Sequence, residues 1–147
     1  MKLIYSKVEP NKLLHIIHSS NDFHNIEDGH RTDVVGADEF IQLSALNMDK
    51  GHTFKPHKHI WKPGEDECIA QESWVVIKGS VECIFYDLDD TIIDKPILKP
   101  GDCSVTLAGG HTYRILEHGT LVYEYKTGPY KGQENDKRFI DSEDEIG

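Results

Sequence analysis

The chain has 147 residues and a mass of 16.7 kDa, enough for one domain with one core and too short for two ordinary domains. Its 26 acidic and 16 basic side chains give a formal net charge of -10, which disfavours binding to nucleic acid or anionic membranes. No stretch approaches the roughly 20 apolar residues of a membrane-spanning helix. Three cysteines without CxxC spacing fit a reducing cytoplasm. We therefore expect one cytoplasmic domain, and its nine histidines stand out.

Residues 1–50 are the first of three segments that we distinguish. Within this segment, residues 12–18 place apolar side chains where they fit either one or two helical turns or an edge strand. Residues 39–48 have the composition of a β-strand. We interpret residues 1–50 as N-terminal strands or an extension that precedes the main body of the fold.

Residues 51–130 are divided by turn signals rich in Gly, Pro and Asp at short, fairly even intervals. The runs between these turns are rich in Val, Ile, Tyr, Phe and Thr, and they cover residues 73–77, 81–88, 91–98, 103–107, 111–116 and 120–126. Short strands with this spacing are typical of an all-β sandwich or barrel. Residues 131–147 are an acidic C-terminal tail, in which residues 134–147 are either solvated or a short helix.

Two of the nine histidines, His57 and His59, flank one lysine in the sequence HKH. In a β-strand, residues i and i+2 point to the same face, so both imidazoles can reach one point. Glu72 begins the next apolar run, and His111 follows a Gly-rich turn further along the chain. Three imidazoles and one carboxylate suit Fe, Mn, Ni, Cu or Zn. The sequence therefore predicts one divalent transition-metal ion bound by these four residues, with coordination positions left open for water or substrate.

These residues resemble the two motifs of the cupin superfamily. Residues 51–59 and 72–79 are similar to the first motif, and residues 101–111 are similar to the second. The resemblance implies a single-domain cupin double-stranded β-helix, a jelly-roll barrel, with residues 51–130 as its core. Three positions depart from the family pattern: twelve residues separate His59 from Glu72 where the family has three or four, Leu107 replaces a proline, and Ile115 replaces an asparagine.

The long segment before Glu72 leaves the identity of the fourth ligand open. Gln71 is adjacent, and Glu65 or Glu67 can fold inward instead. Glu72 is the first choice because its spacing to Gly79 is that of the family motif. The other six histidines lack comparable partners, and we interpret them as structural or exposed: His15, His18, His24, His30, His52 and His118.

Residues 121–130, followed by Asp136 and Lys137, resemble a narrower group, the WbuC-like cupin-fold metalloproteins of bacterial surface-polysaccharide gene clusters. This resemblance covers about residues 51–139. It implies a bound divalent metal and a role connected with sugar metabolism. Small cupins commonly dimerise through their N-terminal strands, so the resemblance also implies a homodimer with residues 1–50 as the candidate dimer arm.

Alternation along the strands predicts which other side chains share the barrel interior with the histidines. It places Lys55, Trp74 and Tyr113 there, where a cation and two aromatic rings suit a sugar-like ligand. Tyr123, on the last strand, is a second candidate proton donor. We therefore expect catalytic roles for Tyr113, Lys55 and Tyr123, and substrate contacts from Trp74 and from Arg31 at the pocket mouth. For the aromatic side chains, plain core packing is the alternative.

Three functions fit such a site. The first is a metal-dependent sugar isomerase or epimerase, in which the metal polarises a carbonyl or hydroxyl and a tyrosine or histidine moves the proton. The second is an iron-dependent dioxygenase of a small molecule, and the third is a non-catalytic module or sensor that binds a small ligand. The expected partners are a sugar-like small molecule and a second copy of the chain.

Overall fold

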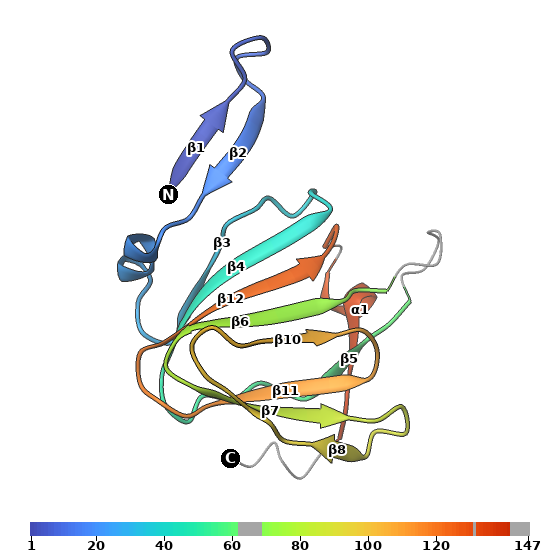
Figure 1. Cartoon of the computed structure of the whole chain (residues 1–147). Helices are drawn as coiled ribbons and strands as arrows, with labels where there is room; N and C mark the ends of the chain where they lie inside the picture. The colour runs from blue at the N-terminus through green and yellow to red at the C-terminus, as the bar shows by residue number, and fades with distance from the viewer. Residues whose placement is uncertain (62–68, 131, 142–147) are drawn as a thin grey trace.

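The computed structural model describes residues 1–61, 69–130 and 132–141 (Figure 1). Within these residues about half of the chain is β-strand and little of it is helix, so the all-β prediction is confirmed. The elements are β1 (Lys2–Tyr5), β2 (Leu13–Ile17), η1 (Ser20–Asn25), β3 (His30–Asp33), β4 (Ile41–Met48), β5 (His57–His59), β6 (Glu72–Lys78), β7 (Val81–Tyr86), β8 (Ile92–Asp94), β9 (Ile97–Leu98), β10 (Cys103–Thr106), β11 (Gly110–Ile115), β12 (Thr120–Thr127), α1 (Gln133–Asp136) and β13 (Lys137–Phe139).

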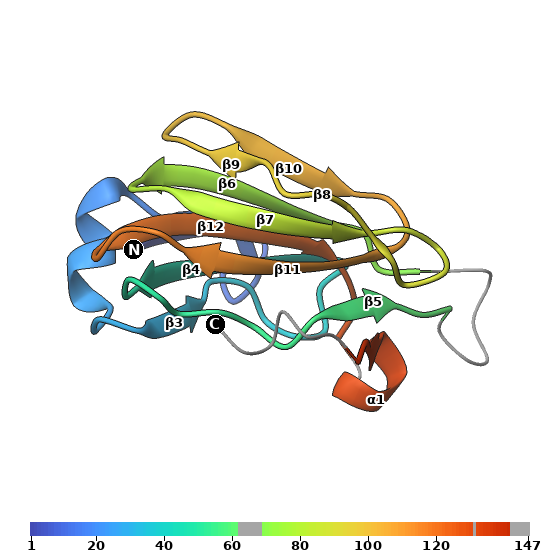
Figure 2. The same ribbon diagram turned by 90° about the horizontal axis from the view of Figure 1, so that it is seen from below.

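The strands of the main body form two antiparallel sheets (Figures 1 and 2). The first sheet has the order β10-β6-β12-β4-β3, and the second has the order β13-β5-β11-β7-β8, with β9 also paired to β7. Consecutive strands from β4 to β7 alternate between the two sheets, and so do consecutive strands from β10 to β12. A chain that passes back and forth between two antiparallel sheets in this way is arranged as a jelly roll.

Apolar side chains on the facing surfaces of the two sheets make the main core. β6 contributes Trp74 and Val76, β7 contributes Val81 and Cys83, and β12 contributes Val122. Burial of each large apolar side chain contributes about 1.5–3 kcal/mol, so this core fixes which face of each strand points inward. Further members of the cluster come from β4, β9 and β11: Leu46, Met48, Leu98, Tyr113 and Ile115.

A second apolar cluster lies on the outer face of the first sheet. Phe23 of η1 packs there with Ala45 of β4 and Tyr123 of β12, which are paired residues in the sheet. The rings of Phe23 and Tyr123 have centroids 4.9 Å apart. Because side chains alternate along a strand, Val122 and Glu124 point to the inner face of β12 while Tyr123 points to this outer layer.

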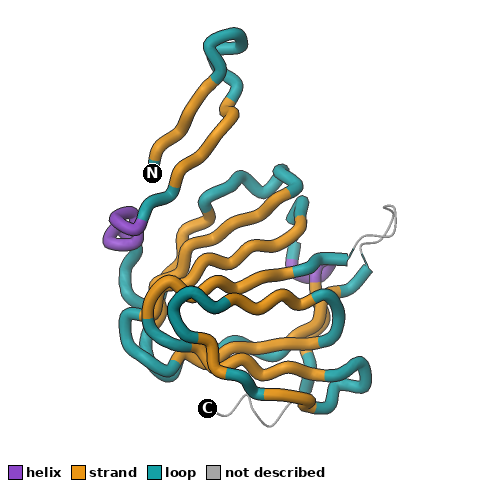
Figure 3. The backbone as a smooth tube through the Cα atoms, in the orientation of Figure 1, coloured by secondary structure: helices purple, strands orange, loops and turns teal. Residues whose placement is uncertain are grey.

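β1 and β2 form a two-stranded hairpin that projects from the body of the molecule (Figures 1 and 3). Residues 12–18 therefore adopt the strand alternative and not the helical one. The hairpin exposes the apolar side chains of Leu3, Tyr5, Leu13, Leu14 and Ile17. An isolated two-stranded hairpin is marginally stable in water, so these side chains are candidates for contacts with another chain.

Some boundaries differ from the sequence expectations. Residues 91–98 form two short strands, because Pro96 has no amide hydrogen to donate to a ladder. The sheets extend beyond residues 51–130, since β3 and β4 precede that segment and β13 follows it. In the described part of the chain, no helix has the length and apolar character needed to cross a membrane.

Candidate metal centre

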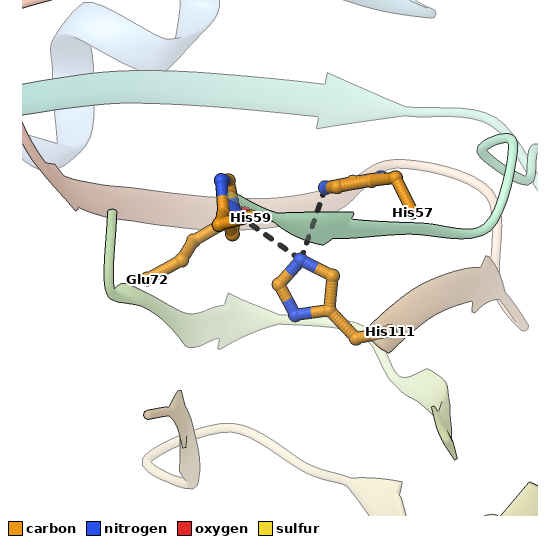
Figure 4. A group of neighbouring side chains, drawn as sticks. All are labelled: His57, His59, Glu72 and His111. Atoms are coloured by element: carbon orange, nitrogen blue, oxygen red, sulfur yellow. Dashed lines mark hydrogen bonds and ion pairs between the residues drawn. The ribbon is translucent and has the colours of Figure 1, made fainter. Parts of the chain in front are cut away.

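Four side chains that the sequence analysis singled out meet between the two sheets (Figure 4). His57 and His59 come from β5, His111 comes from the neighbouring strand β11, and Glu72 begins β6 in the opposite sheet. His57 and His111 are paired residues of the β5–β11 ladder. One donor atom from each of the four residues lies within 4.8 Å of the others, and all four residues are buried.

The donor atoms converge on one small volume. His57 Nε2 lies 3.1 Å from His111 Nε2, and His59 Nε2 lies 2.9 Å from Glu72 Oε2. The same Glu72 oxygen is 3.2 Å from His111 Nε2. Three imidazole nitrogens and a carboxylate oxygen thus share a site of the size and chemistry that a divalent transition metal requires.

The other ring nitrogen of each histidine has a partner outside this group. His57 Nδ1 donates to the backbone oxygen of Lys55 at 3.1 Å, and His111 Nδ1 lies 2.8 Å from Thr106 Oγ1. His59 Nδ1 lies 3.3 Å from the backbone oxygen of Asp136 and 3.4 Å from its Oδ2. A hydrogen on Nδ1 leaves the Nε2 lone pair free for a metal, and such outer contacts also fix the orientation of the ring. The residues therefore fit a metal ion.

The charges in this group depend strongly on their neighbours. Burial lowers the pKa of His57 to about 3, with a further contribution from His111. Burial also acts to lower the pKa of His59, but its contacts with Asp136 and Glu72 outweigh burial and raise the pKa to about 9. Burial opposes ionisation of Glu72, yet His111 and His59 hold the pKa of this carboxyl well below its usual range. Glu72 is consequently an anion that faces the imidazoles, as a cation site needs.

A cavity of about 550 Å³ opens beside His57, His59 and Glu72. Trp74 and Tyr113 line it, and their rings are stacked with centroids 3.8 Å apart and planes 7° apart. Burial and the nearby Glu72 carboxylate raise the pKa of Tyr113 well above its usual value, so the phenol keeps its proton. The cavity thus places an aromatic surface and a phenol next to the candidate metal ligands.

A chain of hydrogen bonds connects the edge of the cavity to the candidate metal ligands. Arg31 Nη2 donates to Glu124 Oε1 at 3.0 Å. Trp74 Nε1 donates to both Glu124 Oε2 at 3.0 Å and Glu72 Oε1 at 3.1 Å. Burial and the Glu72 carboxylate raise the pKa of Glu124, while Arg31 opposes that shift. The indole hydrogen of Trp74 thus joins two buried carboxylates, of which one faces the imidazoles and the other faces Arg31.

No protein-family model matches the sequence, and no curated protein does so. Solved structures match its fold. KdgF from Halomonas sp. is 22% identical, with 69% of this chain and 80% of that chain covered and a TM-score of 0.53. The capsular polysaccharide assembling protein CapF from Staphylococcus aureus is 16% identical, with 80% and 32% covered and a TM-score of 0.64. Oxalate decarboxylase from Bacillus subtilis is 17% identical, with 70% and 24% covered and a TM-score of 0.54.

The chain has the cupin fold. It spans about a third of CapF and about a quarter of oxalate decarboxylase, so these two proteins carry further parts that it does not match. At such identities the likeness concerns the fold alone. The predicted double-stranded β-helix is therefore confirmed, while the narrower resemblance to WbuC-like proteins stays a prediction.

The cupin cavity brings together three of the five catalytic and substrate-contact residues that the sequence analysis named. Trp74 and Tyr113 line it beside the candidate metal ligands, and Arg31 lines it from β3. Lys55 is exposed, and its ammonium lies 4.8 Å from the ring centroid of Phe139. β5 begins only at His57, so strand alternation does not extend back to Lys55 and does not turn it inward.

Tyr123 lies away from the cavity. It packs in the outer cluster, where its hydroxyl lies 2.8 Å from His18 Nδ1 and also donates to the His18 backbone oxygen at 3.2 Å. The inner face of β12 carries Glu124 instead. This placement of Tyr123 corrects the expectation that its phenol reaches the metal ligands, because the register of β12 turns the odd-numbered side chains outward.

The alternatives for the fourth ligand are partly answered. Gln71 is exposed, and its side chain donates to the backbone oxygen of Leu107 at 3.4 Å, so it does not join the histidines. Glu65 and Glu67 lie outside the described residues. Glu72 is the carboxylate that the structure places against His59 and His111.

Sequence reasoning missed several residues at the site. Glu124 was not named as a site residue, although its position two residues after the apolar Val122 gave it an inward direction. Asp136 and Lys137 appeared only as part of a family resemblance, and Lys126 was not singled out. Their roles depend on β13 pairing with β5, a contact between distant segments that no local pattern shows.

Proposed function

We propose that the protein binds one divalent transition-metal ion, Fe, Mn, Ni or Zn, through His57, His59, Glu72 and His111. The observation that carries this proposal is the convergence of three Nε2 atoms and one carboxylate oxygen in a buried site, with each Nδ1 held by an outer partner. When bound, such an ion polarises a carbonyl or hydroxyl oxygen of a ligand.

The ligand in this proposal is a small, sugar-like molecule. The cavity volume falls within the range of small-molecule sites, and its lining combines the stacked Trp74 and Tyr113 with polar side chains. The fold shared with CapF, a capsular polysaccharide assembling protein, supports a role in surface-polysaccharide metabolism. The free thiols of Cys83 and Cys103 support a cytoplasmic setting.

The reaction class that we propose is isomerisation or epimerisation of a sugar. A base takes the proton from the carbon beside a polarised carbonyl, and an acid returns a proton to the same skeleton, so no other reactant is consumed. The raised pKa of Tyr113 suits it to hold and deliver a proton, and the raised pKa of Glu124 suits it to exchange one. Arg31 fixes one oxygen of Glu124, which orients the carboxyl at the cavity edge.

Proton NMR in D₂O tests this reaction class. Metal-loaded protein incubated with reducing sugars, or with nucleotide-sugars whose sugar ring carries a keto group, should exchange the hydrogen on the carbon beside the carbonyl and form an isomer. Both effects should fall by about 10²–10⁴-fold in Tyr113→Phe or Glu124→Gln, the size of a lost acid or base. Saturable binding without exchange or product would support the binding-module alternative and contradict catalysis, and oxygen uptake by the Fe(II) form would support the dioxygenase alternative.

We also propose that the β1–β2 hairpin contacts a second copy of the chain to make a homodimer. Within the described residues the hairpin pairs with no other strand, and apolar side chains including Leu3, Leu14 and Ile17 are exposed along it. Light scattering after size exclusion should give twice the chain mass for the full protein. The triple variant Leu3→Ser, Leu14→Ser and Ile17→Ser should give the single-chain mass, and a single-chain mass for the unaltered protein would contradict the proposal.

A further inference from the structure

Among the residues that the structure describes, Arg31, Lys126 and Lys137 are the cationic side chains that line the cavity, and the first two have carboxylate partners. Arg31 forms ion pairs with Glu124 at 3.0 Å and with Asp33 at 3.4 Å. Lys126 lies 3.4 Å from Asp136 Oδ2, and its ammonium is 4.5 Å from the ring centroid of Tyr130. These contacts largely balance the charges of both side chains within the protein.

Lys137 differs from the other two cations. Among the described residues, its ammonium forms no hydrogen bond and no ion pair, although the side chain is half-buried and lines the cavity. Burial and the neighbouring Lys126 lower the pKa of Lys137, while Glu72 and Asp136 act in the opposite direction. A half-buried ammonium without a direct partner is an unfavourable arrangement unless a ligand supplies the missing anion.

The register of the strands sets where this cation lies. β13 pairs with β5, and Lys137 is opposite His59 in that ladder. Lys137 lines the cavity together with His57, and after burial and His111 its charge is a further cause of the lowered pKa of His57. Lys126, on β12, lines the same cavity.

We propose that Lys126 and Lys137 form an anion-binding subsite beside the metal ligands, and that the cavity selects a hydroxylated ligand carrying a carboxylate or phosphate group. The subsite consists of the two ammonium groups, with Lys137 making the direct contact. The anionic group of the ligand lies against Lys137, and the hydroxylated part of the same molecule extends toward His57 and Glu72 and along the Trp74 ring. This inference rests on the proposed ligand-binding role of the cavity and narrows the substrate class to acidic molecules.

The position of the subsite explains why an acidic protein can still receive an anion. The formal net charge of -10 repels anions at long range, but exposed charges are screened beyond about 8 Å at physiological ionic strength. In the described part of the cavity lining, Glu124 and Asp33 both pair with Arg31, and Glu72 faces the imidazoles. Lys126 pairs with Asp136, which lies outside the lining. Among these described cations, Lys137 is the one whose ammonium forms no ion pair with another described residue.

Isothermal titration calorimetry of the metal-loaded full chain tests the subsite with three probes: D-glucuronate, inorganic phosphate and D-glucose. Glucuronate and glucose differ in the group on the last carbon, so they isolate the effect of a carboxylate, and phosphate shows which kind of anion is preferred. We expect an anionic probe to bind and glucose to bind more weakly. Lys137→Met should lower the affinity for the anion by about tenfold or more, which is the effect of losing a charged hydrogen bond.

Matched variants separate charge at the subsite from loss of folding. Lys137→Arg should retain most of the anion affinity, and Lys126→Met should weaken it in the same direction as Lys137→Met. Lys50→Met, at an exposed turn after β4, removes the same charge elsewhere and should leave affinity unchanged. Circular dichroism and metal content should match the unaltered protein in every variant that is compared.

Two results would overturn the subsite: neither anion binds the metal-loaded protein, or Lys137→Met binds the anion as tightly as the unaltered protein. Both of these results can be distinguished from failure of the proposed isomerase activity, because they concern binding of the anion and not turnover of a sugar. Turnover of a neutral sugar, found together with either of these two binding results, would leave isomerase activity standing without the subsite. Anion binding that depends on Lys137, without turnover of any sugar, would support the subsite and contradict the isomerase.

Discussion

In the part of the chain that the structure describes, two groups of side chains bring histidine and carboxylate atoms within 4.8 Å of one another, one group buried and the other largely exposed. The first is the buried group of His57, His59, Glu72 and His111. The second group is Asp28, Asp49 and His118, in which Asp28 Oδ2 lies 3.5 Å from His118 Nε2 and Asp49 Oδ1 lies 2.9 Å from His118 Nδ1. Asp28 and His118 are exposed, and Asp49 is partly exposed.

The comparison shows that proximity of donor atoms does not by itself make a metal site. In the surface group both ring nitrogens of His118 face aspartates, so neither nitrogen is held by an outer partner that directs the other toward an ion. In the buried group each Nδ1 contacts a neighbour and each Nε2 faces the other ligands. Burial also excludes water, so the electrostatic attraction between a cation and the buried carboxylate is stronger than it is at the surface.

The largest expected effect is loss of metal from the buried group. The double variant His57→Ala and His59→Ala removes two of four donors, so its metal content by elemental analysis should fall from one equivalent per chain to near zero. The control His118→Ala alters the surface group and should keep one equivalent. Full metal content in the double variant would contradict the assignment of the site.

Loss of a residue that holds the Nδ1 atom of a ligand should lower metal affinity less than loss of the ligand itself, but more than a change at the surface group. Asp136→Asn keeps the shape of the side chain but removes the charge that lies 3.4 Å from His59 Nδ1. We expect metal affinity to fall by about 10–100-fold, as is usual for such partners, when it is measured by competition with a chromophoric chelator. Asp49→Asn is the matched change in the surface group. An equal loss of metal affinity in that variant would contradict the conclusion that only the buried group binds the metal.

Metal affinity of the buried group should increase with pH. In the metal-free protein the pKa of His59 is raised to about 9, so below that pH a metal must displace its proton. With one proton released, affinity should rise by about tenfold per pH unit from pH 7 toward 9 and then level off. The pKa of His57, about 3, adds no further proton in this range. Affinity that is constant from pH 7 to about 9 would contradict the protonation of His59.

The free energy of unfolding of the metal-free protein should also depend on the protonation of His59. Because the pKa of His59 is higher in the folded protein than in the unfolded chain, protonated His59 stabilises the fold. This contribution is complete below pH 6.5 and is lost as the pH rises through about 9. His57 acts in the opposite sense, because its lowered pKa removes stability as pH falls from 6.5 toward about 3. Urea denaturation of the metal-free protein should therefore show lower free energies of unfolding at both ends of this range, and His59→Gln should remove the loss on the alkaline side.

The smallest expected effect concerns the hydroxyl beside His111. Thr106→Val removes the Oγ1 atom 2.8 Å from His111 Nδ1 and preserves the shape of the side chain. We expect a loss of about 1 kcal/mol in the free energy of unfolding, the usual net value of one buried hydrogen bond. Thr32→Val on the exposed strand β3 is the control, and an equal change in both variants would show that the contact with His111 contributes nothing.

The buried group was accessible from the sequence because its determinants are local. The HKH sequence puts two imidazoles on one face of a strand, and Glu72 and His111 each adjoin an apolar strand whose burial is evident from composition. The all-β class followed from the same short apolar runs between turns. Each of these signals depends on neighbours within a few residues of the chain.

The rest of the site depends on contacts that no local pattern encodes. Lys137 reaches the cavity and Asp136 reaches His59 because β13 pairs with β5, and about half of the chain separates these two strands. Lys55 was predicted inward by extending strand alternation one step beyond the start of β5. Tyr123 was predicted as a candidate proton donor at the site, whereas the register turns the charged Glu124 inward to pair with Arg31 and Trp74.

Anomalous diffraction at the absorption edge of the bound metal tests the central claim most directly. Crystals of the metal-loaded protein should give one strong anomalous peak, enclosed by the Nε2 atoms of His57, His59 and His111 and a carboxylate oxygen of Glu72. A strong peak between Asp28, Asp49 and His118 instead, or the absence of any peak at the buried group, would contradict the account.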